Sequence, residues 1–128
     1  MTLIAATMQS FFTDRLITQR RVSPRTVASY RDTMRLLVVF AQERHGRPVH
    51  RLDWADLDTT TITAFLEHCE QTRANSTRTR NLRLTAIRSL FVYASLRHPE
   101  HAATIQRVLA ISPWESPRLA DGGYDALR

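Results

Sequence analysis

The stretch NSTRTRNLRLTAIRSLFVYA, residues 75–94, combines a helix-start signal with an apolar stripe. Asn75 or Ser76 has a short polar side chain that can cap the free N–H groups of a helix beginning there. The second half carries apolar residues three and four positions apart, the spacing that buries one helix face: Ile87, Leu90, Phe91 and Ala94. The stretch predicts a long helix, ending near Arg97, that packs its C-terminal half into a core.

The first half of the same helix carries three arginines, Arg78, Arg80 and Arg83, with no acid beside them. On a helical wheel, Arg80 falls close to the direction of the apolar stripe and Arg83 lies at its edge. A helix built only for burial would keep that stripe apolar throughout. We therefore predict that this half projects beyond the packed core and meets an anion, so that losing Arg80 or Arg83 leaves the fold nearly unchanged.

The rest of the chain repeats the three- and four-residue apolar spacing and lacks strand-like alternation. The expected helices are, in order, residues 3–20, a segment opened by Ser23 and Pro24 and ended by Gly46, one capped by Asp58 or Thr59, residues 75–97, and a short helix opened by Pro99. This pattern predicts an all-α bundle of four main helices and a short fifth. We expect one domain over residues 1–112 and a linker or loose tail over 113–128.

Length and composition narrow the classes of protein. A chain of 128 residues with 43% hydrophobic content favours one folded domain. No run approaches the roughly 18–20 apolar residues of a membrane span, and the first ten residues lack the pattern of a signal peptide. We therefore expect a cytoplasmic protein without a membrane partner. Cys69 is the single cysteine and is expected to be a buried, reduced thiol.

Charge is segregated along the chain. All 18 basic residues are Arg, and the net charge is +6. Residues 14–35 hold six Arg against two Asp, residues 52–70 hold five acids and no Arg, and residues 71–98 hold six Arg and no acid. Arg suits phosphate because its planar fork donates two hydrogen bonds to two oxygens. There are two alternatives. The exclusive use of Arg can reflect a GC-rich genome, and the segregated charges can be solvated helix faces without a partner.

The two basic segments coincide with two expected helix starts, SPRTVASY at residues 23–30 and NSTRTRNLR at residues 75–83. Helix N-termini present free N–H groups and a positive dipole end, which favour phosphate. Ser, Thr, Arg and Asn are also the residue types that hydrogen-bond DNA phosphates and base edges. The pattern predicts a nucleic-acid surface at these starts.

Other chemistry has weaker support. His98 and His101 are three apart, but structural metal sites use four ligands at tight spacings, so we expect surface histidines. Asp53 and Asp56 precede Asp58 without the glycine and glutamate of a calcium loop, and are expected to cap the third helix. No glycine-rich phosphate loop occurs. We expect no metal, no cofactor and no small-molecule substrate.

Three segments in order resemble the N-terminal core-binding domain of tyrosine recombinases, the phage integrase family. They are residues 23–41, 56–70 and 75–94, and the resemblance spans about residues 8–112. The matching positions are Ser23, Thr26, Tyr30, Ile62, Phe65, Leu66, Ser76, Thr79, Leu84, Ala86, Ile87, Arg88, Leu90 and Phe91. The resemblance implies a SAM-like bundle that lies across double-stranded DNA, with its second and fourth helices facing the major groove.

By this resemblance, the DNA contacts fall on Arg25, Thr26, Ser29, Thr77, Arg78, Arg80 and Arg83. Other recombinase subunits are implied as further partners. The family's catalytic domain carries a His-x-x-Arg motif and a tyrosine nucleophile, and this sequence has no His-x-x-Arg. We therefore expect a DNA-binding arm without catalytic activity. The alternatives are a helical protein–protein interaction module and a small stand-alone DNA-binding regulator.

Overall fold

Helices account for most of what the computed structural model describes, which is residues 2–19, 22–72 and 76–113. In order, the elements are α1 (Ile4–Ser10), the π-helix η1 (Phe11–Gln19), α2 (Pro24–His45), the 3₁₀ turns η2 (Val49–Arg51) and η3 (Trp54–Asp56), α3 (Thr59–Thr72), α4 (Thr77–Arg97), the 3₁₀ turn η4 (Pro99–His101) and α5 (Ala102–Leu109). The predicted all-α architecture is confirmed. Residues 114–128 of the expected tail lie outside the described residues.

The predicted helix boundaries are set by local hydrogen bonds. Ser23 caps α2 with Pro24 following it at the first helical position, and Gly46 ends the helix in the left-handed conformation at φ 64°. Asp58 caps α3, because its Oδ1 accepts the N–H of Thr61 at 2.9 Å. Each boundary rests on a residue whose side chain, or whose lack of one, suits the end of a helix.

The first helix differs from the single α-helix expected over residues 3–20. It is α-helical to Ser10 and π-helical from Phe11. A π-helix bonds residues five apart and has a wider turn than an α-helix. Phe11 and Leu16 are five apart, and both are buried at 1% and 3% exposure. The wider turn therefore keeps both side chains on the core side.

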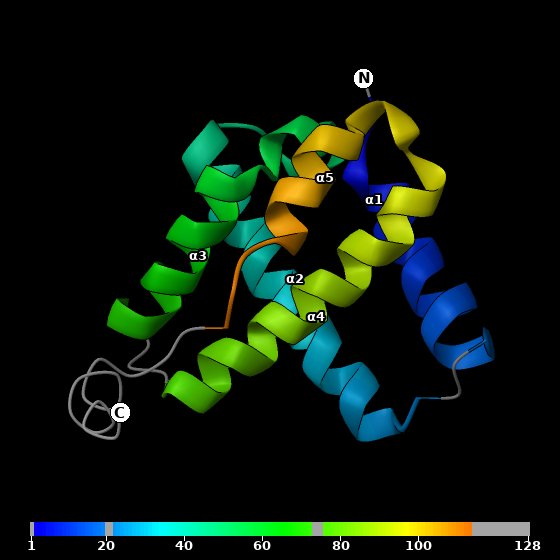
Figure 1. Cartoon of the computed structure of the whole chain (residues 1–128), viewed down its shortest axis with the longest axis horizontal. Helices are drawn as coiled ribbons and strands as arrows, with labels where there is room; N and C mark the ends of the chain where they lie inside the picture. Colours follow the sequence, from blue (N-terminus) through cyan, green and yellow to red (C-terminus); the bar gives the residue numbers. More distant parts are fainter. Residues whose placement is uncertain (1, 20–21, 73–75, 114–128) are drawn as a thin grey trace.

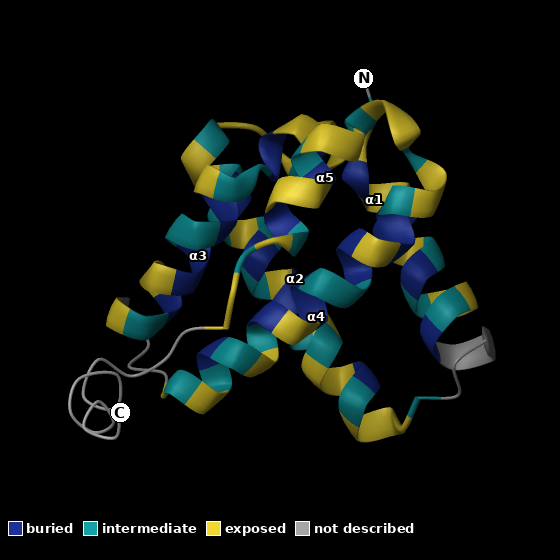
Figure 2. Ribbon diagram, in the orientation of Figure 1, coloured by how far each residue is buried: buried dark blue, intermediate teal, exposed yellow. Residues whose placement is uncertain are grey.

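The two longest helices, α2 and α4, cross near the centre of the molecule, with α3 on one side of the crossing and α1 on the other (Figure 1). Buried positions gather where the helices face one another (Figure 2). Phe91 of α4 is fully buried and meets Trp54 edge-on, with ring centroids 5.2 Å apart. The C-terminal half of α4 is core, as predicted, and Cys69 is buried as expected.

Two expectations about the turn before α3 are wrong. Asp53 and Asp56 do not cap α3; their side chains form a reciprocal capping box around the 3₁₀ turn η3. Asp56 is buried and also accepts a hydrogen bond from Arg47 Nη1 at 2.9 Å. These carboxylates are needed here because the turn packs into the core, where its backbone N–H groups require acceptors.

The histidines at the end of α4 are not surface groups. His98 is mostly buried, and its Nε2 lies 2.7 Å from the hydroxyl of Thr7 on α1. Burial lowers the pKa of His98, although the nearby Glu100 carboxylate opposes that shift. His101 is also mostly buried, with Nε2 3.7 Å from Asp53. The two histidines thus join the N-terminal segment, the turn before α3 and the end of α4.

Candidate nucleic-acid interface

The starts of α2 and α4 lie at the same edge of the molecule, on either side of the helix crossing (Figure 1). The chain reaches this edge twice, once after η1 and once after α3. Both helices therefore direct their free N–H groups and positive dipole ends toward one side. An anion that spans both starts would meet two such ends.

The two starts have the same capping geometry. Ser23 Oγ accepts the N–H of Thr26 at 3.2 Å and donates to its hydroxyl at 3.1 Å. Ser76 Oγ accepts the N–H of Thr79 at 3.1 Å and donates to its hydroxyl at 3.2 Å. Between serine and threonine, each start carries one arginine at the same helical position: Arg25 and Arg78. The repeated pattern Ser-x-Arg-Thr thus presents two matched arginines.

Neither helix has an acidic residue in its first turn. Acids are the residues that stabilise a helix N-terminus, and cations there cost about 0.3–1 kcal/mol each at low salt. Arg25 and Arg78 are both exposed, and neither forms an ion pair with an acid among the described residues that would offset that cost. This local arrangement is unfavourable alone and favourable with a bound polyanion.

The other predicted contacts divide into two groups. Ser29 is exposed one turn beyond Arg25, on the same side of α2. Thr26 and Thr77 are half-buried, and Thr26 takes part in the α2 cap. Five of the seven predicted contact residues therefore lie at or near the surface of the two starts.

The sequence predicted that Arg80 would project beyond the packed core, but Arg80 lies within the core. Its exposed fraction is 7%, and its Nε lies 3.6 Å from Glu70 Oε1 on α3. The guanidinium extends the apolar stripe of α4 by pairing with the neighbouring acidic helix. The wheel placed Arg80 on the buried face correctly, but the conclusion that the face ends before Arg80 is wrong.

Arg83 is also directed inward. Its side chain is 11% exposed, and its Nη1 lies 3.5 Å from Asp32 Oδ2 and 3.5 Å from the Thr33 hydroxyl on α2. Asp32 in turn pairs with Arg35 at 3.3 Å. Arg83 therefore joins α4 to α2 near their crossing. Together with Arg80, it fixes the position of the α4 start relative to both neighbouring helices.

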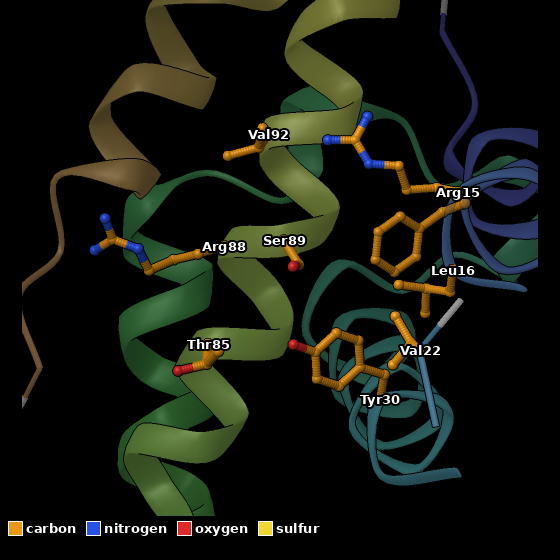
Figure 3. Close-up of a pocket in the computed structure, with 9 residues that line it drawn as sticks. Arg15, Leu16, Val22, Tyr30, Thr85, Arg88, Ser89 and Val92 are labelled. Carbon is orange, nitrogen blue, oxygen red and sulfur yellow. The ribbon is translucent and has the colours of Figure 1, made fainter. Parts of the chain in front are cut away.

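A pocket of about 340 Å³ lies beside this edge, between η1, α2 and α4 (Figure 3). Its lining residues are Phe11, Arg15, Leu16, Val22, Tyr30, Thr85, Arg88, Ser89 and Val92. Sequence reasoning did not single out this pocket. One signal was available, because Thr85 and Ser89 are small polar residues four apart, a spacing that places both on one face of α4.

Other kinds of site have little support in the described ranges. No three His, Cys, Asp or Glu side chains among the described residues are arranged to hold a metal ion. Within the same part of the chain, no helix is both long and apolar enough to cross a bilayer. The basic helix edge is therefore the strongest candidate.

Comparison with known proteins gives one family. The family model described as "Phage integrase, N-terminal SAM-like domain" matches residues 10–98. The chain is 51% identical over 108 residues to "Putative integrase/recombinase y4rC" of Sinorhizobium fredii (strain NBRC 101917 / NGR234), covering 84% of this chain and 32% of that protein. It is 42% identical over 109 residues to "Putative integrase/recombinase y4rD" of the same strain, covering 85% and 39%. The chain thus spans about a third of these relatives, and no solved structure matches.

Proposed function

Because this chain belongs to the family of phage integrase N-terminal SAM-like domains, we propose that it is the DNA-binding arm of a tyrosine-type site-specific recombinase. It holds duplex DNA at the starts of α2 and α4, and other recombinase subunits are its further partners. The observation that carries the proposal is the pair of matched starts at one edge, each with an exposed arginine and no acid.

The contacts divide between direct and supporting roles. Arg25 and Arg78 bind phosphates or base edges directly, because both are exposed beside free helix N–H groups. Thr26, Ser29 and Thr77 add hydroxyl donors on the same two helices. Arg80 and Arg83, by contrast, act mainly by holding the α4 start against α3 and α2 through Glu70 and Asp32.

This chain alone neither cleaves nor joins DNA under the proposal. The family match is to the N-terminal domain of integrases, and the resemblance to tyrosine recombinases implies that the tyrosine nucleophile lies in another domain. Tyr93 is 5% exposed and is packed between arginines, so it is poorly placed to attack a phosphate. A covalent DNA adduct on Tyr30, Tyr93 or Tyr124, sought by mass spectrometry after mixing with duplex, would contradict this assignment. Tyr124 lies outside the described residues.

The test is a salt-dependent duplex titration. Nonspecific binding should have a Kd of roughly 10⁻⁴–10⁻⁶ M at physiological salt. Neutralising about three to five phosphates should weaken binding roughly 40- to 500-fold between 50 and 200 mM salt. Binding that ignores salt would contradict the proposal and favour a protein–protein interaction module.

Matched variants locate the surface. Arg25→Ala and Arg78→Ala should each weaken binding and lower the salt slope by about 1. Arg107→Ala is the control, because Arg107 is also exposed but lies on α5, away from both starts. Equal losses for all three arginines would mean that net charge, and not the α2–α4 edge, determines binding.

A further inference from the structure

The second half of α2 is apolar on more than its buried side. Leu37 and Ala41 are fully buried in the core, whereas Val39, on the opposite side of the helix, is 46% exposed. Leu36 and Phe40, next to Val39 on the helix surface, are half-buried. A helix that met only solvent on this side would carry polar residues there. The outer face of α2 is therefore suited to contact with another protein surface.

Two hollows flank Val39 on this face. One, of about 360 Å³, lies between α2 and the α1–η1 segment, and its lining includes Met8 and Phe12. The other, of about 200 Å³, lies between α2 and α3, and its lining includes Phe40 and Phe65. Val39 lines both hollows and so forms a ridge between them. Ridges of one helix that fit into grooves beside another are the usual basis of helix packing.

Charge on the same face is arranged evenly about Val39. Arg35 lies four residues before Val39 and Glu43 lies four residues after it, a spacing that keeps all three on one side of α2. Glu43 is exposed and forms no ion pair among the described residues. Arg35 pairs with Asp32 at 3.3 Å, but these side chains are 65% and 48% exposed, and such surface pairs contribute little. Both charges are therefore available to a partner.

We propose that this face binds the same face of a second copy of the chain. The two α2 helices run antiparallel about a two-fold axis beside Val39, and each Val39 packs against its counterpart at the edge of the partner's hollows. Arg35 and Glu43 each lie about 6 Å along the helix from the axis, so Arg35 of either copy faces Glu43 of the other. Two ion pairs then enclose the apolar centre.

Self-complementarity favours a second copy over an unrelated partner. A two-fold interface brings one patch against itself, so each cation on the patch needs an anion at the symmetry-related position. Arg35 and Glu43 meet this requirement. Arg31, another cation at the border of the face, lies over the Phe12 ring at 5.3 Å and is thereby held toward η1. One helix face makes a small interface, and interfaces below about 1,200 Å² are weak, so the dimer should form reversibly at high concentration.

The antiparallel arrangement has a consequence for the two α2 starts. Each start lies 15 residues from Val39, so the two starts would be about 45 Å apart at opposite ends of the helix pair. The dimer would then hold two DNA segments on opposite sides. This consequence rests on the proposed function, whereas the dimer itself does not.

Sedimentation equilibrium of the 128-residue chain without DNA tests the dimer. The average mass should rise from that of the monomer toward that of the dimer as the concentration increases. Val39→Asp should keep the chain monomeric, because it places two carboxylates side by side at the axis. Leu82→Asp is the matched control, since Leu82 is also apolar and 53% exposed but lies on α4, outside both hollows. It should associate like wild type, and circular dichroism should show unchanged helix content in both variants.

Charge reversal tests the antiparallel arrangement. Arg35→Glu and Glu43→Arg should each weaken self-association roughly tenfold or more, because two like-charged pairs replace two opposite pairs. An equal mixture of the two variants should form a heterodimer as tight as the wild-type dimer, because every facing pair again joins a cation to a carboxylate. The double variant should also associate like wild type. Recovery on mixing cannot result from a damaged fold.

Three results would overturn the proposal. One is a wild-type mass that stays monomeric at every concentration, which would leave the face to a different protein. Another is Val39→Asp that associates like wild type, which would assign self-association to another surface. The third is a mixture of the reversed variants that stays monomeric, or that binds more tightly than wild type as a parallel pair would. Arg25→Ala and Arg78→Ala, which test DNA binding, should leave self-association unchanged, so the two proposals fail separately.

Discussion

Replacing Arg80 with alanine removes the guanidinium that joins the start of α4 to α3. The paired atoms are 3.6 Å apart, and their attraction is roughly 4–5 kcal/mol at an effective dielectric constant of about 20. Much of that attraction is offset by the desolvation of Arg80, which is 7% exposed. The net stabilisation by the pair is therefore much smaller than the attraction.

The cost of breaking the pair is larger than its net contribution, because Glu70 would remain without this cation. Removing one partner of a fully buried pair costs about 3–5 kcal/mol. The Glu70 side chain is 23% exposed and keeps partial access to water, which reduces the penalty. We expect Arg80→Ala to lower the free energy of unfolding by about 2–3 kcal/mol. Phe91→Ala, at a fully buried position, should cost about 3–5 kcal/mol.

Urea denaturation followed by circular dichroism measures these costs. Arg78→Ala is the matched control, because Arg78 is two residues away and exposed, and it should stay within about 0.5 kcal/mol of wild type. A double-mutant cycle with Glu70→Ala should give a coupling energy above roughly 1 kcal/mol. If Arg80→Ala unfolds at the wild-type urea concentration, Arg80 does not hold α4 against α3, and the division between direct and supporting arginines is wrong.

Three further predictions concern stability. Burial lowers the pKa of His98 below its ordinary value of about 6.5, so the folded state resists protonation of this side chain. The free energy of unfolding, measured at pH 7.5, 6.5 and 5.5, should therefore decrease as the pH is lowered, and His98→Gln should make that decrease smaller. Asp56→Ala removes a buried acceptor shared by Arg47 and a backbone N–H, and should lower the free energy of unfolding in urea by about 2–4 kcal/mol. A loss under about 1 kcal/mol would mean that these two hydrogen bonds contribute little. Gly46→Ala should cost about 1–2 kcal/mol in thermal melts, because Gly46 has φ 64° with open space around it; an unchanged melting temperature would show that the turn relaxes.

Most of the fold could be read from local signals in the sequence. Ser23, Asp58 and Ser76 cap the helices that they were expected to cap, and Gly46 ends α2. These signals work because a cap is satisfied within three or four residues of its own position. The π-helical turn after Ser10 was not predictable in this way, since it depends on how Phe11 and Leu16 pack against distant helices.

The site was harder to predict for the opposite reason. Arg80 and Arg83 have the same sequence context as Arg78, with no acid nearby along the chain. Their partners, Glu70 and Asp32, are brought to them only by the packing of α3 and α2. Whether a cation faces solvent or a distant carboxylate is a tertiary question, and sequence spacing does not answer it.

The crossing of α2 and α4 makes the distance between the two helix starts depend on the angle at which the helices cross. The contact of Arg83 with Thr33 and Asp32 lies near the crossing, and the helix starts lie at the far ends of the same two helices. A small change in the crossing angle would move the helix starts further than it moves the residues at the crossing, because the displacement grows with distance along each helix. Substitutions at Thr33, which is 2% exposed, can therefore change the distance between Arg25 and Arg78 without touching either. Thr33 would then set the spacing of the two groups that Arg25 and Arg78 bind on a ligand, although Thr33 itself does not contact that ligand.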